Sequence, residues 1–432
     1  MTSTILALTG LATILLVLAA ILSKRLSPLV AFTVLPLGAA VVLGRGGDAG
    51  ALMQQGMLAV APMGAMFLFA ILFFAVLADA KLFEPIIAAV LRFGGDHPGR
   101  VAVGTAILTT IVQLDGSGAV TFLIVVPALA PVYDRLGMDR RVLACVVAMG
   151  AGVGNMLPWG GPTIRAATAL DVSVTELFNP VIPVFLAGTA ATLLFSWWLG
   201  VRQRNTLVVL AGASGPSPGG EPATALPNWQ FWANIALVIA VLGTMLAEFA
   251  PPAVAFLVGT VLALLINFPR VSDQWDAVTR HGGAAITMVA ILFAAGAFTG
   301  IMRGTGMLDA LARGGADLLP GGSASQLPVI VAVLSMPLSL LFDPDSFYFG
   351  ILPLLGGIAE HGGVPAIEVG RAAILGQMTT GFPVSPMTPA TFLLVGLAKI
   401  DLADHQRFAI PYLFALTLVM TLVALALGVI RL

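Results

Sequence analysis

Long apolar runs alternate with short polar ones along most of this 432-residue chain. A helix that crosses the hydrocarbon core of a bilayer needs about 20 mostly apolar residues. The runs predict ten spanning segments, of which the fourth and the ninth are interrupted near the middle. These segments are 4–22, 28–43, 54–78, 140–171, 180–200, 231–249, 253–267, 277–302, 366–398 and 407–430. The pattern therefore predicts an all-α polytopic membrane protein with two broken helices.

Two further apolar regions, 99–135 and 327–360, each contain a polar break in the middle. The first is broken at Asp115 and the second at Asp343-Pro344. Each region is predicted to form a re-entrant hairpin, in which two short helices enter the membrane and return to the same side. Non-helical backbone at that depth is tolerated only where it is buried in protein or faces a water-filled cavity. The breaks therefore predict a cavity.

The breaks recur at the same spacing in both halves of the chain. Asp115 is followed 43 residues later by Pro158, inside the fourth segment, and Asp343 is followed 43 residues later by Pro386, inside the ninth. Interrupted apolar segments at matching places in two halves are the best sequence indicator of the binding site of a secondary transporter. We therefore expect an inverted repeat and a transport function.

The basic residues predict how the segments are oriented. Cytoplasmic loops of membrane proteins carry an excess of Lys and Arg. Residues 201–230 are rich in Pro, Gly and polar residues, as expected of a linker between repeats 1–200 and 231–432. If this linker is cytoplasmic, 14 of the 20 basic residues lie on the cytoplasmic side, five lie outside, and Arg165 lies within the membrane. This arrangement places the amino terminus outside.

Composition narrows the class of protein. The chain is 59% hydrophobic and only 9% charged, with a mean hydropathy of +1.02, whereas soluble proteins average about 25% charged residues. A net charge of −1 argues against a nucleic-acid partner, and the sequence has no P-loop lysine motif for ATP. The four histidines fall in predicted loops or helix ends, where we expect them to be solvated and too shallow to activate a serine. We expect no enzyme activity and no permanently bound cofactor.

Three carboxylates lie at the two predicted hairpin tips. Carboxylates inside membrane segments are rare and by default mark ion or proton pathways. Asp115, Asp343 and Asp345 are therefore candidates for proton or cation coupling, and Asp115 and Asp345 are also candidates to meet a metal ion carried by the substrate. The alternative is that a tip lies near the membrane surface and its acid only caps a helix.

Helix starts at the breaks supply the second kind of candidate. The start of a helix carries unpaired N–H groups and about half a positive charge, so it attracts carboxylates. Arg165 either binds an anionic ligand or neutralises a nearby Asp, while glycines, hydroxyls and amides allow close contact with a polar solute. The candidate substrate-binding residues are Gly116, Ser117, Gly118, Asn155, Pro158, Gly160, Gly161, Thr163, Arg165, Ser346, Tyr348, Thr380, Ser385, Thr388 and Thr391.

Several of these segments resemble one known family, the citrate–metal:proton symporters (CitMHS) of the ion transporter superfamily. The resemblance rests on Leu114–Gly118, Thr121–Ile124, Asn155–Thr163 with Arg165, Asp345–Gly350, Gly381–Pro386 and Asp404–Phe408. It implies a homodimeric carrier of the inner (plasma) membrane with a scaffold domain and a moving transport domain. The substrate is then expected between the hairpin tips and the broken helices, and to cross by an elevator-like movement.

The charge of the predicted cavity bears on the substrate. Free citrate carries about three negative charges at neutral pH, whereas the cavity offers three Asp and one basic residue, Arg165. Such a site repels a bare tricarboxylate and suits one whose charge is largely cancelled by Mg²⁺, Ca²⁺ or protons. We therefore expect proton-coupled import of citrate, or a close tricarboxylate, with a divalent metal. A proton/cation antiporter and a proton-coupled carrier of a free organic acid remain the alternatives.

Overall fold

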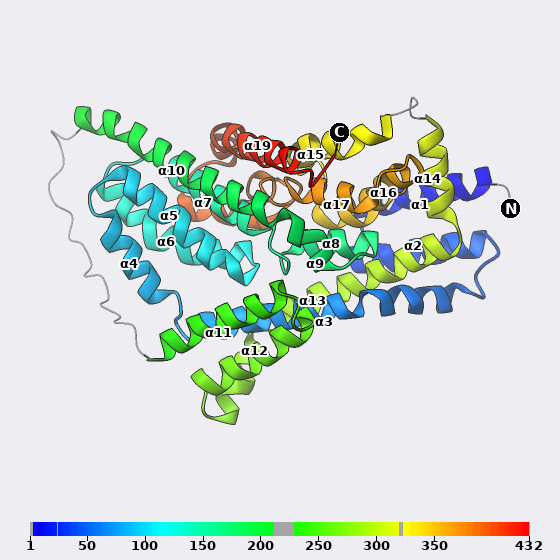
Figure 1. The fold of residues 1–432 in the computed structure, drawn as a ribbon, viewed down its shortest axis with the longest axis horizontal. Coiled ribbons are helices and arrows are strands. Elements are labelled where there is room, and N and C mark those ends of the chain that lie inside the picture. Colours follow the sequence, from blue (N-terminus) through cyan, green and yellow to red (C-terminus); the bar gives the residue numbers. More distant parts are fainter. Residues whose placement is uncertain (1–2, 24, 211–228, 319–322, 432) are drawn as a thin grey trace.

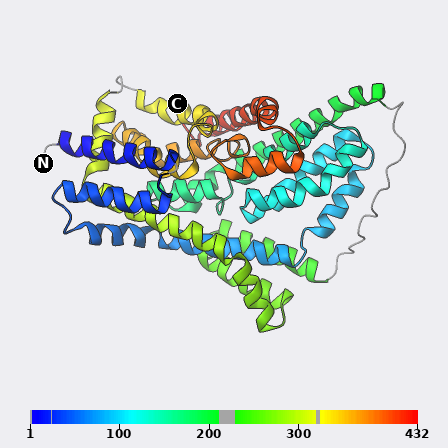
Figure 2. The same cartoon turned by 180° about the vertical axis from the view of Figure 1, so that it is seen from behind.

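The computed structural model describes residues 3–23, 25–210, 229–318 and 323–431, and the regular structure within these ranges is helical (Figure 1). Most helices run along the long axis of the molecule, with α1 and α14 near one end and α4 to α6 near the other (Figures 1 and 2). Seven of the described helices are long and apolar enough to cross a membrane. The prediction of an all-α membrane protein is confirmed.

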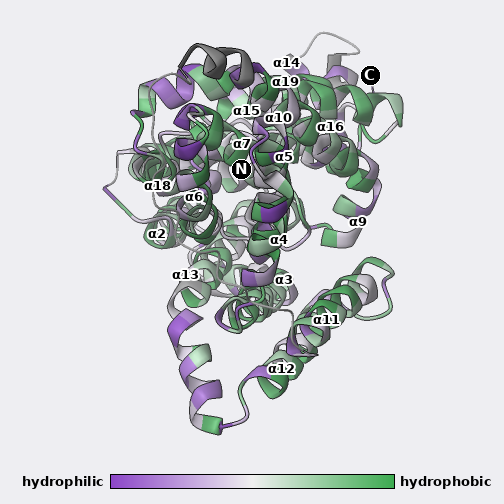
Figure 3. Cartoon of the chain, turned by 90° about the vertical axis from the view of Figure 1, so that its left-hand side faces the viewer, coloured by the Kyte–Doolittle hydropathy of each residue, from purple (hydrophilic) through white to green (hydrophobic). Residues whose placement is uncertain are grey.

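One group of helices is built around the contact between α3 (Ala49–Asp79) and α13 (Val271–Gly304). Glycine permits this contact, because a methyl group at Gly56 would overlap the Gly296 carbonyl oxygen. The other helices of this group are α1 (Ser3–Leu22), α2 (Pro28–Val42), α11 (Trp229–Leu246) and α12 (Pro252–Asn267). Figure 3 shows α11 and α12 leaning away from the rest of the bundle, with most of their residues coloured as hydrophobic.

The two regions predicted to be hairpins form helix–break–helix units. The first consists of α5 (Pro98–Val112), a 3₁₀ turn (Gln113–Asp115) and α6 (Gly118–Arg135). The second consists of α15 (Leu327–Leu338), a π-helical turn (Ser346–Ile351) and α16 (Leu352–His361). The breaks fall where the sequence predicts them, at Asp115 and around Asp343.

The two interrupted segments are each divided into separate helices. The first is α7 (Arg140–Gly154) and α8 (Gly161–Leu170), and the second is α17 (Ala366–Ile374) and α18 (Pro389–Ala398), with a 3₁₀ segment at Phe382–Val384. We call residues 155–160 the first break and residues 375–388 the second break. Pro162 and Pro389 stand in the first turn after each break, where proline needs no N–H partner.

The remaining helices complete the second group, which carries the tips and breaks. The long α10 (Ile182–Leu210) and α19 (Leu402–Ala426) pack against each other, and α10 also contacts α5. Because α10 extends to Leu210, the first third of the expected linker is helical, and residues 211–228 lie outside the described residues.

Short helices were not predicted, because a search for runs of about 20 apolar residues does not detect them. They are α4 (Glu84–Gly94), α9 (Val174–Phe178), a 3₁₀ turn (Asn179–Val181), α14 (Met307–Leu318) and a 3₁₀ turn (Ser323–Gln326).

Candidate functional site

The first hairpin tip is held by its own polar side chains. Asp115 ends the 3₁₀ turn and accepts the backbone N–H of Ser117 at 2.7 Å. Ser117 then caps α6, since its hydroxyl oxygen accepts the N–H of Val120 at 3.4 Å. Gly116 lies between them at φ +74°, a left-handed conformation that glycine adopts without strain. The Asp115 side chain therefore orders this tip while remaining in the interior, where the residue is 8% exposed.

The first tip contacts both breaks. The indole N–H of Trp159, in the first break, donates to the carbonyl oxygen of Leu114 at 2.7 Å. On the other side, a methyl group at Gly118 would lie 2.5 Å from the ring of Phe382 in the second break. Gly118 is thus required for the close approach of the tip to that ring.

The second tip is capped by Asp343. Its carboxylate accepts the backbone N–H groups of Asp345 and Ser346, both at 3.0 Å, and the Ser346 hydroxyl at 2.5 Å. Serine often caps helices through its hydroxyl oxygen, but the Ser346 hydroxyl instead donates its hydrogen to the Asp343 carboxylate. Asp343 therefore caps the start of the following helical turn, as the alternative interpretation of the tip acids expects. The side chain of Asp345 is not used in this cap and can contact another helix.

Asp345 forms a buried ion pair with Arg165. The guanidinium Nε donates to the Asp345 carboxylate at 2.7 Å, and both side chains are only 10% exposed. The pair joins α8 to the second hairpin tip, 180 residues later in the sequence. Of the two roles considered for Arg165, the structure shows the neutralisation of a nearby Asp.

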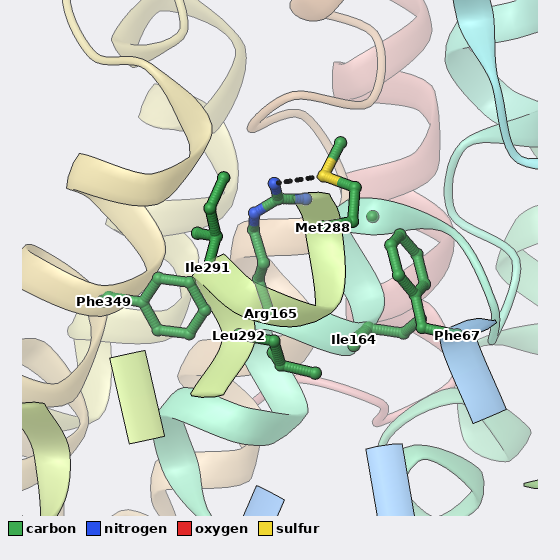
Figure 4. Close-up of a pocket in the computed structure, with 8 residues that line it drawn as sticks. Phe67, Ile164, Arg165, Met288, Ile291, Leu292 and Phe349 are labelled. Atoms are coloured by element: carbon green, nitrogen blue, oxygen red, sulfur yellow. Dashed lines mark hydrogen bonds between the residues drawn. The ribbon is translucent and has the colours of Figure 1, made fainter. Parts of the chain in front are cut away.

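Arg165 also faces the first group of helices. Its Nη2 lies 3.7 Å from the Met288 sulfur on α13. Figure 4 shows the guanidinium beside Met288, with Phe67, Ile291 and Phe349 around it. The ion pair therefore lies next to the apolar boundary between the two groups of helices.

The carbonyl groups of the second break receive side-chain donors. The hydroxyls of Thr388 and Thr391 both donate to the Phe382 carbonyl, at 2.8 and 2.7 Å. His405 Nε2 lies 2.9 Å from the Pro383 carbonyl oxygen, and the Gln406 amide donates to the Val384 carbonyl at 2.8 Å. These donors replace the helical N–H groups that the break removes.

The expectation that His405 is solvated is wrong, because the residue is fully buried. The sequence placed it ahead of the last spanning segment, but α19 begins at Leu402, so His405 lies in the first turn of that helix. There it reaches the second break from α19. Of the other histidines, His97 caps α5 through its ring nitrogen.

Further predicted site residues hold the breaks together. The Asn155 amide donates to the Met378 carbonyl at 2.6 Å, which joins the first break to the second. The Ser385 hydroxyl donates to the Ser339 carbonyl at 2.5 Å, which joins the second break to the second hairpin. Three more hydroxyls have protein partners: Tyr348 donates to the Gln377 carbonyl, Thr163 donates to the Met156 carbonyl, and Thr380 pairs with Thr417.

Pro158, Gly160 and Gly161 form the end of the first break and the start of α8. Gly160 is the residue that precedes the helix, and a methyl group there would overlap the Asn155 carbonyl. A methyl group at Gly161 would lie 2.7 Å from a guanidinium nitrogen of Arg165. These glycines therefore leave room for the fold of the break and for the arginine.

Five buried polar side chains near the tips and breaks have atoms without a hydrogen-bond partner in the described part of the chain. They are Gln113 and Thr121 of the first hairpin, Gln377 and Thr379 of the second break, and His405 of α19 through its Nδ1. Buried polar groups are normally paired, so these atoms indicate a place for a ligand or water. The predicted set of site residues contains none of these side chains; the proximity of Gln113 to Asp115 in the sequence was the available signal.

The described residues contain no group of three or more His, Cys, Asp or Glu side chains arranged to hold a metal ion. Asp115 and Asp345 each have other polar partners, the Ser117 N–H and Arg165. The site is thus a meeting point of two tips and two breaks, rich in oxygen and amide groups, with one guanidinium.

The sequence of this chain is similar to those of known citrate transporters. The sequence model of the family described as "Citrate transporter" (CitMHS) matches residues 1–376. A citrate transporter of Bacillus subtilis (strain 168) is 40% identical over 425 residues, which cover 98% of this chain and 99% of the relative. A Mg(2+)/citrate complex secondary transporter of the same organism is 36% identical over 431 residues, which cover 98% and 99%.

Among solved structures, the YdaH transporter of Alcanivorax borkumensis has a similar fold. The TM-score is 0.66 over 87% of this chain and 86% of that one, and 16% of the residues are identical.

Proposed function

Since this chain belongs to the citrate transporter (CitMHS) family, whose members are membrane carriers and not enzymes, we propose that it imports citrate, or a close tricarboxylate, as a complex with a divalent metal ion and together with protons. The metal ion is part of the substrate, and the protons are the coupling ions.

The charge balance of the site is the observation that carries this proposal. The two hairpin tips hold Asp115, Asp343 and Asp345. Among the described residues, the basic side chain paired with one of these acids is Arg165 of α8, which contacts Asp345. Two carboxylates thus have no cationic partner there. Free citrate, with about three negative charges, would be repelled. A complex with a divalent cation carries about one negative charge, which a single guanidinium can balance.

The ion pair suggests how substrate and coupling ion are linked. A free carboxylate of the complex can replace Asp345 on Arg165, because guanidinium groups bind carboxylates in paired hydrogen bonds. The released Asp345 then takes up a proton or turns toward the metal ion. In either case one binding event changes the partner of a buried acid, so substrate and proton or cation binding become interdependent.

Asp115 and the unpartnered amides supply the remaining contacts in this proposal. Mg²⁺ and Ca²⁺ bind oxygen ligands, and Mg²⁺ keeps several of its water molecules. Gln113 offers its side-chain amide, and Gln377 offers its side-chain NH2 group, to such waters or to citrate hydroxyl and carboxylate oxygens. Mg²⁺ is the ion named for a relative that is 36% identical, and we take Mg²⁺–citrate as the first substrate to test.

For the architecture, we propose two inverted repeats, 1–200 and 231–432, and an elevator-like movement of the helices that carry the tips and breaks against α3 and α13. The exposed apolar side chains of α11 and α12, such as Ile239 and Leu265, suit lipid or a second copy in a homodimer.

The proposed cytoplasmic position of the linker is tested with Ala223→Cys in a Cys145→Ser background, in the inner membrane of intact cells. Labelling by an impermeant reagent from outside would reverse the proposed orientation.

The transport proposal is tested by double-label uptake of citrate and Mg²⁺ into proteoliposomes under an inward proton gradient. Both labels should enter together, and chelation of the divalent ions should stop citrate uptake. Equal citrate uptake without divalent ions would instead indicate a carrier of the free acid. Cation exchange without citrate uptake would indicate an antiporter.

A further inference from the structure

A cavity of about 370 Å³ with both polar and apolar lining lies between α8, α3 and α13, near the C-terminal end of α8. Its polar lining comes from all three helices: Gln55, Thr168, Asp171, Thr299 and Arg303. Glycines of α3 and α13 form much of the remaining wall. The cavity is separate from the tips and breaks.

The cavity continues the boundary on which Arg165 lies. Arg165, Thr168 and Asp171 recur at three-residue spacing along α8, on the side that faces α3 and α13. With a rise of 1.5 Å per residue, Asp171 lies about 9 Å beyond Arg165 along the helix. Between them the Thr168 hydroxyl contacts the Met63 sulfur of α3 at 2.8 Å. The contact of Thr168 with Met63 thus separates the ion pair from the cavity.

Arg303 provides the positive charge of this cavity. Its Nη1 lies 2.8 Å from the Asp171 carboxylate, and the side chains of the pair are 39% and 54% exposed. An ion pair this exposed contributes little to stability, so a carboxylate of a solute can displace Asp171 at small cost. In the buried pair of Arg165 and Asp345, by contrast, an Asp345 released in this way must take up a proton or a cation.

Acidic groups lie close to Arg303 on its other side. A neighbouring cavity of about 330 Å³ is lined by Arg303, Asp171, Asp309, Glu360 and His361. Asp309 is shared between Arg313 and His361, at 2.7 and 3.4 Å. Arg303 is the guanidinium that lines both cavities, beside Asp171, Asp309 and Glu360. This lining disfavours a free polycarboxylate and suits a complex that presents both a carboxylate and a cation.

We propose that the cavity around Arg303 is an outer binding site for the same metal–carboxylate complex, in which Arg303 binds a free carboxylate of the solute before that solute reaches Arg165. This inference rests on the proposed transport function. The competing explanation is that the pair of Arg303 and Asp171 only fastens α13 to the end of α8.

Uptake by single variants separates the two explanations. In an outer site, Arg303→Gln should raise the KM for Mg²⁺–citrate about tenfold, which corresponds to about 1.4 kcal/mol, with little change in the maximal rate. Asp171→Asn should leave the KM unchanged or lower it, because it frees Arg303. If the ion pair only holds α13 against the end of α8, both variants should change the maximal rate by a similar factor and leave the KM unchanged. That result would refute the proposal. Arg313→Gln is the matched control, since it removes an exposed charge nearby.

Labelling of Gln55→Cys in a Cys145→Ser background tests occupancy directly. Mg²⁺–citrate should slow the reaction with a charged thiol reagent several-fold, and Arg303→Gln should abolish this protection. Protection should persist when Arg165→Gln and Asp345→Asn together disable the inner site, a combination that leaves no unpaired buried charge. Absence of protection in a variant that still transports Mg²⁺–citrate overturns the outer site and leaves the proposed function intact. Absence of uptake by the unmodified chain refutes the proposed function instead.

Discussion

The ion pair of Arg165 and Asp345 allows a quantitative test, in which each side chain is neutralised alone and then both together. The atoms lie 2.7 Å apart and the side chains are 10% exposed. Removal of one partner from a buried pair leaves the other charge uncompensated and costs about 3–5 kcal/mol. Arg165→Gln and Asp345→Asn should each lower stability by about this amount, whereas the double variant should lose less than the sum of the two.

The assay is a double-mutant cycle on protein purified in detergent, with stability measured by unfolding in denaturant and transport measured by uptake into proteoliposomes. We expect a coupling energy of about 2–4 kcal/mol, since two unit charges about 4 Å apart interact by about 4 kcal/mol at an effective dielectric constant of 20. The double variant should lose about 2–4 kcal/mol less stability than the sum of the two single variants and should still fail to accumulate citrate, which separates the structural role from the transport role.

The exposed pair of Arg313 and Asp309 is the control, because its side chains are 64% and 54% exposed. Its coupling should not exceed about 1 kcal/mol. A coupling between Arg165 and Asp345 as small as that of the control would refute the buried pair. Full citrate accumulation by the double variant would refute its role in transport.

Three other substitutions test the tips and breaks. Asp115→Asn should abolish uphill uptake while the protein still inserts; full proton-driven accumulation would mean that this acid only orders the first tip. Gly118→Ala should destabilise the protein by about 1–3 kcal/mol through overpacking against the second break, whereas Gly396→Ala, with open space around it, should not; equal thermal stability of the two variants would contradict the close approach. His405→Ala should lower stability by about 1–3 kcal/mol, because it leaves a buried carbonyl unpaired, and it should raise the KM for citrate. His405→Gln keeps an N–H donor, so its stability and its KM should stay close to those of the unmodified chain. An Ala variant with unchanged stability and KM would show that the second break does not need this donor.

The sequence by itself determined the class of fold and the places where helices are broken. The length of an apolar run decides whether a helix can span a bilayer, and Pro, Gly and Asp inside such a run interrupt it through local backbone chemistry. The breaks at Asp115 and Pro158 follow from neighbouring residues alone, which is why they were predicted at the correct positions. Short helices such as α4 and α14 carry too little apolar length to be detected in this way.

The sequence also identified most of the candidate site residues but could not determine which residues they contact. All three acids were candidates for proton or cation coupling, yet Asp343 caps its own helix while Asp345 pairs with Arg165. His405 looked solvated, yet it reaches a carbonyl of the second break. Such contacts join residues far apart in the sequence, and their distances depend on how whole helices pack. Only the tertiary structure decided them, because hydrogen bonds and ion pairs are formed over about 3 Å of space, whatever the separation along the chain.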